Sequence, residues 1–127
     1  MKFIHTGLAA SSEEKADRFY IDVLGFEKST PKILDRSMTH AIFGIEKDLL
    51  IINYKNENVH YEILIYADYI PPEKQIAHSC IMVIDLKNLI KKCRDAGLKV
   101  IEVPKGTGTI TFISDYDRNL FEIKEGQ

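Results

Sequence analysis

The chain has 127 residues, a length typical of one compact domain that buries an apolar core without disulfides or a structural metal. Its 45% hydrophobic and 28% charged residues are ordinary for a globular protein and argue against disorder. A formal net charge of −2 lacks the basic surface that nucleic acid binding needs, and no apolar run approaches the roughly 18 residues of a membrane span.

The first predicted elements are a short strand and a helix. Residues Phe3–Leu8 form an apolar run that contains His5 and predicts a strand. Ser11 and Ser12 then offer N-caps, with Glu14 placed as a capping-box partner. The helix that follows has an apolar stripe at helical spacing and ends at Gly25; the stripe consists of Ala16, Phe19, Tyr20, Val23 and Leu24.

The region from residue 26 to residue 66 contains strand-like runs separated by polar or glycine-bearing breaks. It predicts a β-meander with strands at Thr39–Phe43, Asp48–Asn53 and Val59–Tyr66. Segment Ala67–Lys74, which contains Pro71 and Pro72, cannot continue a central strand and is the predicted crossover between two halves of the chain.

The second half repeats this order of elements. A strand is predicted at Ile76–Ile84, and Asp85 caps a helix that Gly97 ends. The remaining predicted strands are Leu98–Val103, Thr109–Ser114 and Leu120–Lys124, with turns at Pro104–Gly108 and Asp115–Asn119. The pattern is β-α-β-β-β twice, so the fold class is α+β, and one helix per half leaves a sheet face uncovered.

The two halves also match in their polar residues. His5 precedes Gly25 by 20 residues, and His78 precedes Gly97 by 19. Each half ends on an aromatic-Glu-Ile strand, but Glu62 lies 37 residues after Gly25 whereas Glu122 lies 25 after Gly97, which indicates a 12-residue insertion in the first half. Two imidazoles and two carboxylates brought together on a sheet make a divalent-metal site.

The other histidines and the cysteines receive no such role. His40 and His60 are expected to be ordinary surface or core residues, although His60 shares a strand face with Glu62. Cys80 and Cys93 are expected to be buried, reduced thiols, with Cys80 on the strand face of His78. The N-terminus enters a strand directly, without a signal-peptide pattern, so we expect a cytoplasmic protein.

Several short segments, in this order and spacing, resemble the vicinal oxygen chelate superfamily, which includes glyoxalase I, methylmalonyl-CoA epimerase, extradiol dioxygenases and bleomycin-resistance proteins. The resemblance covers almost the whole chain. It rests on His5, Phe19-Tyr20, Leu24-Gly25-Phe26, His78, Ala96-Gly97-Leu98, and Phe112-Ile113-Ser114-Asp115 running on to Asn119-Leu120-Phe121-Glu122-Ile123.

This resemblance implies a single domain spanning 1–127, built from two βαβββ modules at about 1–67 and 75–127, whose curled mixed sheet holds one divalent metal ion. Carried over by position, the metal ligands are His5, Glu62, His78 and Glu122, a set most similar to that of glyoxalase I. The ion would be Ni, Zn, Co, Mn or Fe. Glu122 is implied as the catalytic base, with Glu62 as its counterpart. Members commonly form homodimers, and whether the modules pair within or between chains stays open.

The implied function is a metal-dependent lyase or isomerase of the glyoxalase type, acting on a 2-oxo or α-hydroxycarbonyl small molecule. Segment Thr6–Ala10 lacks the arginine with which glyoxalase I holds a glutathione carboxylate, which argues against glutathione thioacetals. Two alternatives are a metal-free drug-binding protein of the bleomycin-resistance type and an enzyme similar to methylmalonyl-CoA epimerase.

In the turn before Asn119, Arg118 is expected to take a positive φ unless the turn changes type.

Overall fold

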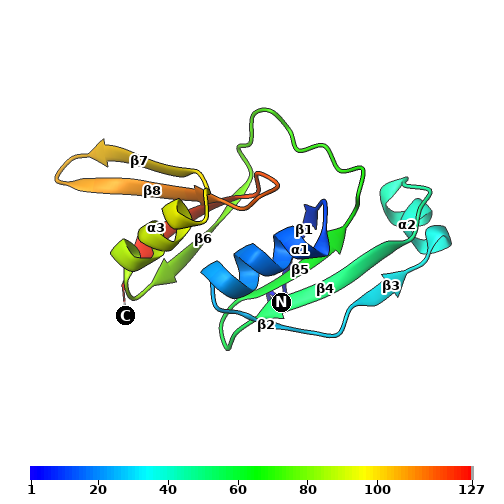
Figure 1. Ribbon diagram of the computed structural model, residues 1–127. Helices are drawn as coiled ribbons and strands as arrows, with labels where there is room; N and C mark the ends of the chain where they lie inside the picture. The colour runs from blue at the N-terminus through cyan, green and yellow to red at the C-terminus, as the bar shows by residue number, and fades with distance from the viewer. Residues whose placement is uncertain (127) are drawn as a thin grey trace. The chain divides into compact units, whose positions relative to one another are not determined.

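The computed structural model describes residues 1–126, which form two compact units (Figure 1). Unit 1 comprises Met1–Ile70 and unit 2 begins at Pro71, so the boundary lies inside the predicted crossover segment. Each unit has its own mixed sheet, as expected for two βαβββ-type modules. That the units together form one domain, with modules at 1–67 and 75–127, stays a prediction.

Unit 1 contains a five-stranded sheet in the order β1-β5-β4-β2, with β3 also paired to β4. Strands β1 and β5 are parallel, and the other pairs are antiparallel. The strands are β1 Thr6–Ala10, β2 Glu27–Lys28, β3 Lys32–Leu34, β4 Leu49–Lys55 and β5 His60–Ile65, and the helices are α1 Glu13–Ala16, η1 Asp17–Val23 and α2 Arg36–Phe43. The β3–α2 segment is the extra element relative to unit 2.

The first helix covers one face of this sheet, as its apolar stripe predicts. Ser12 is the N-cap and accepts a hydrogen bond from the backbone N–H of Lys15, and the helix continues as the wider π-helical segment η1. Gly25, with φ of 76°, turns the chain into β2. The buried ring of Tyr20 stacks on Tyr54, with centroids 5.1 Å apart, which fastens the helix to the sheet.

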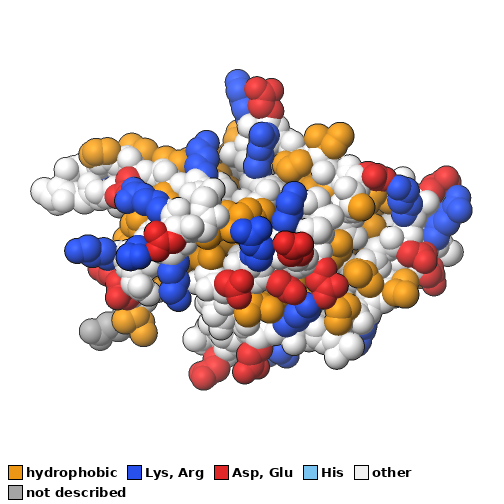
Figure 2. All heavy atoms as spheres, viewed as in Figure 1, with side chains coloured by type: hydrophobic (Ala, Val, Ile, Leu, Met, Phe, Trp, Pro, Cys, Tyr) orange, Lys and Arg blue, Asp and Glu red, His pale blue; other side chains and the backbone are white. Residues whose placement is uncertain are grey.

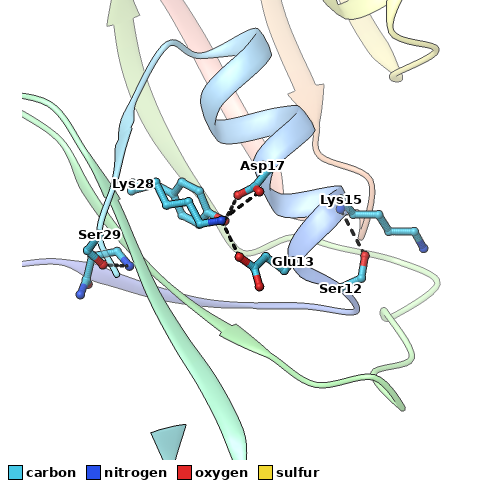
Figure 3. Close-up of polar contacts among 8 residues, drawn as sticks. Ser12, Glu13, Lys15, Asp17, Lys28 and Ser29 are labelled. Carbon is cyan, nitrogen blue, oxygen red and sulfur yellow. Dashed lines mark hydrogen bonds and ion pairs between the residues drawn. The ribbon is translucent and has the colours of Figure 1, made fainter. Parts of the chain in front are cut away.

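A charged network ties the same helix to strands β2 and β4 (Figure 3). Lys28 Nζ donates to Glu13 and to Asp17 Oδ2, and the Tyr54 hydroxyl donates to Asp17 Oδ1 at 2.7 Å. Partial burial lowers the pKa of Lys28, but its hydrogen bonds to Glu13 and Asp17 outweigh that and raise the pKa overall. Burial and Asp17 both raise the pKa of Tyr54, so the phenol stays protonated and donates.

Two sequence predictions for unit 1 are wrong. The predicted strand Thr39–Phe43 is helix α2, because Asp35 caps it by accepting from Met38 N–H and Gly44, with φ of 72°, ends it in the left-handed conformation. These caps outweigh the strand preference of the local sequence. The first strand begins at Thr6 and not at Phe3, because the register places Asn58 and Val59, which precede β5, opposite Phe3 and Ile4.

Unit 2 repeats the topology without an insertion. Its four strands have the order β6-β9-β8-β7, with β6 and β9 parallel. One helix covers the sheet, capped by Asp85 and followed by Gly97 with φ of 73°. The strands are β6 His78–Val83, β7 Val100–Lys105, β8 Gly108–Ser114 and β9 Leu120–Glu125, and the helix is α3 Leu86–Asp95.

The turn between β8 and β9 is organised by one buried carboxylate. Asp115 Oδ1 accepts from the N–H groups of Asp117 and Asn119, at 2.9 and 2.8 Å, and its other oxygen accepts from the Asn119 amide. Arg118 has a φ of 65°, which confirms the positive φ expected for this turn without glycine.

None of the helices within residues 1–126 has the length and apolar character that crossing a membrane requires. The face in Figure 2 carries basic and acidic side chains mixed together, in keeping with the small net charge.

Candidate metal centre

Each unit brings one histidine and one glutamate together by the same strand register. In the parallel pair β1–β5, Gly7 lies opposite Glu62, so His5 precedes the partner of Glu62 by two residues. In the parallel pair β6–β9, Cys80 lies opposite Glu122, so His78 precedes the partner of Glu122 by two residues. Side chains two residues apart share a strand face, so each imidazole lies diagonally beside its carboxylate.

In unit 1 the pair is partly exposed to solvent. His5 Nε2 lies 3.6 Å from Glu62 Oε2, with side-chain exposures of 36% and 27%. His60 lies next to it, with its ring centroid 5.4 Å from that of His5 and its Nε2 2.7 Å from Asn53 Oδ1. Partial burial, together with the nearby His5, lowers the pKa of His60. His60 and Glu62 therefore share a sheet face, as the sequence predicts, and His5 lies on the same face.

In unit 2 the pair has an orienting contact that the sequence did not reveal. His78 Nε2 lies 3.8 Å from Glu122 Oε1, while Nδ1 lies 2.8 Å from the carbonyl oxygen of Ile76. A carbonyl oxygen only accepts, so Nδ1 carries the proton in the neutral ring and Nε2 keeps its lone pair on the side of Glu122. The edge contact with Phe112, at 5.1 Å between centroids, further holds the ring.

Both pairs fit a divalent metal by their chemistry. Neutral imidazole nitrogen and carboxylate oxygen are ligands of Zn, Ni, Co, Mn and Fe. The 3.6 and 3.8 Å separations are shorter than two metal–ligand bonds of about 2.1 Å placed end to end, so one ion can contact both members of a pair. Each unit supplies one such pair, and no metal-binding group of three or more forms among residues 1–126. That all four side chains share one ion stays a prediction.

A pocket of about 430 Å³ opens beside the unit 1 pair. Besides His5 and Glu62, it is lined mainly by apolar and aromatic residues, among them Phe43, Ile45, Leu49, Leu64, Tyr66 and Tyr69. Three of these, Phe43, Ile45 and Leu49, lie between residues 27 and 58. The caps Asp35 and Gly44 were the sequence signal that would have predicted helix α2, which ends at Phe43. A larger hollow of about 790 Å³ lies over helix α3 and contains neither His78 nor Glu122.

The two cysteines differ from each other. Cys93 is buried, and burial raises the pKa of its thiol to about 11. Cys80 is exposed, so the prediction that both thiols are buried is wrong for Cys80. The reason is that exposure alternates along strand β6, and Cys80 lies on its exposed face together with His78 and Met82. His40, given no role, lies on helix α2 with Nδ1 3.6 Å from Glu46.

Comparisons with known proteins agree with the fold. No curated protein matches the chain. The glyoxalase family protein from Enterococcus faecalis is 20% identical, with a TM-score of 0.73 over 96% of this chain and 95% of that one. The trypanothione-dependent glyoxalase I of Leishmania major is 16% identical, with a TM-score of 0.68 over 98% and 86%.

A third solved structure is a mutant of the fosfomycin resistance protein FosX from Listeria monocytogenes, complexed with Mn(II) and 1S,2S-dihydroxypropylphosphonic acid. It is 14% identical, with a TM-score of 0.74 over 99% of this chain and 90% of that one. Identities this low establish a common fold and nothing finer. The family model for the Glyoxalase/Bleomycin resistance protein/Dioxygenase superfamily matches residues 2–123. The chain therefore belongs to the Glyoxalase/Bleomycin resistance protein/Dioxygenase superfamily.

Proposed function

We propose that this protein is a divalent-metal-dependent lyase or isomerase of the glyoxalase type, acting on a 2-oxo or α-hydroxycarbonyl small molecule. The observation that supports it best is the repeated register, which sets one histidine diagonally beside one glutamate in both units. A chance scatter of polar residues would not repeat this placement. The Mn(II) bound to the related FosX structure adds support for a metal at this fold.

Under this proposal His5, Glu62, His78 and Glu122 hold one metal ion. When bound, such an ion supplies Lewis-acid stabilisation to the oxyanion that develops on the substrate. As a carboxylate, Glu122 would take the proton from the carbon beside the carbonyl, and Glu62, protonated from solvent, would give a proton to the neighbouring position; Glu122 then releases its proton to solvent, so both groups return to their starting state. The hydrogen bond between His78 Nδ1 and the Ile76 carbonyl keeps the other ring nitrogen free to act as a ligand.

Metal analysis of protein purified without chelator tests the proposal. After incubation with Mn, Ni, Co, Zn or Fe(II), the chain should retain about one equivalent, and His5→Ala or His78→Ala should each reduce this below about a tenth. His40→Ala is the matched control, because His40 lies on α2 with an exposed side chain and should leave the metal content unchanged. Retention below about a tenth of an equivalent by the unaltered chain would contradict the proposal.

A second candidate is a metal-free binding protein of the bleomycin-resistance type, which the unit 1 pocket favours because its lining is mostly apolar. It predicts that a small planar ligand raises the melting temperature by the same amount with and without EDTA. The metalloenzyme predicts instead that EDTA lowers both the melting temperature and ligand binding.

We also propose that the protein is a homodimer. Large apolar side chains are exposed in both units, including Phe3 and Ile33 in unit 1 and Ile76 and Ile84 in unit 2. Exposed apolar surface of this kind is typical of faces that another chain covers. Light scattering during size-exclusion chromatography should give twice the mass of the chain, and a monomer at micromolar concentration would contradict the dimer.

A further inference from the structure

The unit 1 pocket has an open floor made by small residues. On the sheet face that carries Glu62 and Leu64, the paired positions of β1 are Gly7 and Ala9. A Cβ added to Gly7 would lie 3.7 Å from Leu64 Cδ1, in ordinary contact, so any longer side chain at this position would extend over the floor. The absence of such a chain leaves space directly beside the Glu62 carboxylate.

The walls of the pocket come from two segments held by backbone hydrogen bonds. Phe43 ends helix α2, and Ile45 follows the left-handed Gly44, whose N–H donates to the His40 carbonyl. On the other side, Tyr66 donates its N–H to the Ala10 carbonyl, and Tyr69 donates its own to the Tyr66 carbonyl. The pocket is therefore formed by ordered backbone and not by freely moving loops.

The charges of the pocket do not suit an anion. Among its described lining residues none is a lysine or an arginine, and the one carboxylate is Glu62. The cations of the adjoining segment are already paired, Lys47 with Asp68 and Arg36 with Glu46. An anionic group placed against these apolar walls, away from the His5–Glu62 end, would lose its hydration without a counter-charge, which is strongly unfavourable.

The shape and charge together define a class of substrate. A volume of about 430 Å³ lies within the range of small-molecule sites, and its apolar walls gain free energy by covering an aliphatic or aromatic group. The register of β1 and β5 places His5 and Glu62 at one end of this lining and Leu64 and Tyr66 at the other. A molecule that fits has an uncharged apolar body and carries its oxygens at one end.

We propose that the unit 1 pocket selects uncharged 2-oxo or α-hydroxycarbonyl compounds with an apolar body, oriented with their oxygens toward His5 and Glu62, and excludes anionic ones. The proposal rests on the proposed function for the oxygen-bearing end of the substrate. The selection itself comes from the walls and from the lack of an unpaired cation, which are properties of unit 1 alone.

Calorimetric binding of two matched probes to the Mn(II)-treated full chain tests this selection. 2-Hydroxyacetophenone is neutral, and its 4-carboxylate derivative differs by one anionic group. We expect the neutral probe to bind at least about tenfold more tightly. Ile45→Arg should weaken the neutral probe and reverse the preference, because the new guanidinium supplies the missing counter-charge. Ile33→Arg, at an exposed position outside the pocket, should change neither affinity.

A second pocket variant keeps the selection testable if Ile45→Arg fails to fold. Phe43→Ala removes a wall without adding charge and should weaken the neutral probe by about tenfold while leaving the weak binding of the carboxylate unchanged. Equal or tighter binding of the carboxylate by the unaltered chain, or no measurable binding of either probe at millimolar concentration, would overturn the inference.

The same measurements separate this inference from the proposed function. If the chain retains no metal but still prefers the neutral probe, the metalloenzyme proposal fails and the pocket selectivity stands. If the chain retains one equivalent of metal but prefers the carboxylate, the selectivity fails and the metalloenzyme proposal stands.

Discussion

Units 1 and 2 share a topology but differ in what surrounds their histidine–glutamate pairs. Both place the pair by parallel pairing of their first and last strands, in the same register. Unit 1 alone has the β3–α2 insertion, and Phe43 at its end lines a pocket beside the pair. In unit 2 a direct hairpin joins β7 and β8, and the corresponding sheet face exposes Cys80 and Met82. The shared topology thus places the histidine–glutamate pairs, and an insertion in one copy adds the pocket.

The largest expected effect separates the roles of the two glutamates. Glu122→Gln keeps a ligand oxygen but removes the basic carboxylate, so we expect α-proton exchange of 2-hydroxyacetophenone in deuterated solvent to slow by about 100- to 10,000-fold. Glu62→Gln should slow it less, because the proposed function has Glu62 return the proton and not remove it. Nuclear magnetic resonance gives both rates, with Glu57→Gln in an exposed turn as control. Equal rates for Glu122→Gln and the unaltered chain would exclude Glu122 as the base.

A second prediction concerns the thiols of unit 2. Burial raises the pKa of Cys93 to about 11 from an ordinary 9.0, which lowers its thiolate fraction about 100-fold at pH 8. A chromogenic disulfide reagent should therefore titrate one thiol per native chain rapidly, and Cys80→Ser should abolish that phase. Two rapid thiols in the native chain would contradict the burial of Cys93.

The raised pKa of Cys93 also has a consequence for stability. The unfolded chain releases this proton near pH 9, whereas the folded chain retains it to about pH 11. The folded state therefore binds more protons across this interval, and its free energy of unfolding should fall as pH rises from about 9 to about 11. Urea unfolding at several pH values measures the slope, and Cys93→Ala should reduce it.

A third prediction compares two turns at equivalent places in the repeat. Asn56 Oδ1, before β5, accepts from the N–H groups of Asn58 and Val59 in an exposed turn. Asp115, before β9, is buried and accepts three hydrogen bonds. Asp115→Ala should lower the free energy of unfolding by about 2–3 kcal/mol and Asn56→Ala by about 0.5–1 kcal/mol, because burial removes water as a substitute partner. Urea denaturation of both variants measures the two losses in the free energy of unfolding, and equal losses would contradict the prediction.

The smallest expected effect concerns how each helix is fastened to its sheet. Tyr54→Phe leaves Asp17 without one hydrogen-bond donor in the Lys28 network and should lower the free energy of unfolding by about 1–2 kcal/mol. Arg94→Ala breaks an exposed ion pair between α3 and Glu102 and should lower it by less than about 1 kcal/mol. Thermal unfolding of the two variants gives both values. A larger loss for Arg94→Ala would show that exposure does not weaken the unit 2 contact.

Much of the scaffold was predictable because its signals are local and repeated. The apolar stripes, the caps Ser12 and Asp85, and the stop glycines Gly25 and Gly97 predicted both covering helices. The 12-residue excess in the first half agrees with the added β3–α2 segment. The parallel pairing of the first and last strands of each unit, which juxtaposes histidine and glutamate, came only from the structure.

The sequence predictions failed where a short segment is compatible with both a strand and a helix, or where burial depends on distant residues. Residues 39–43 have strand-forming side chains, and only the caps Asp35 and Gly44 decide for a helix. The exposure of Cys80 could not be deduced from a period-two pattern, since that pattern assigns residues to a face but does not say which face is covered.

The amino-acid sequence by itself determined the repeat, the two covering helices and the four candidate ligands, because these depend on periodicity and on spacing along the chain. Only the tertiary structure decided that His78 Nδ1 meets the Ile76 carbonyl and that Phe43 and Tyr69 enclose a pocket beside Glu62. Those contacts join residues whose approach depends on packing between elements, and packing energies are set by three-dimensional neighbours that no local pattern specifies.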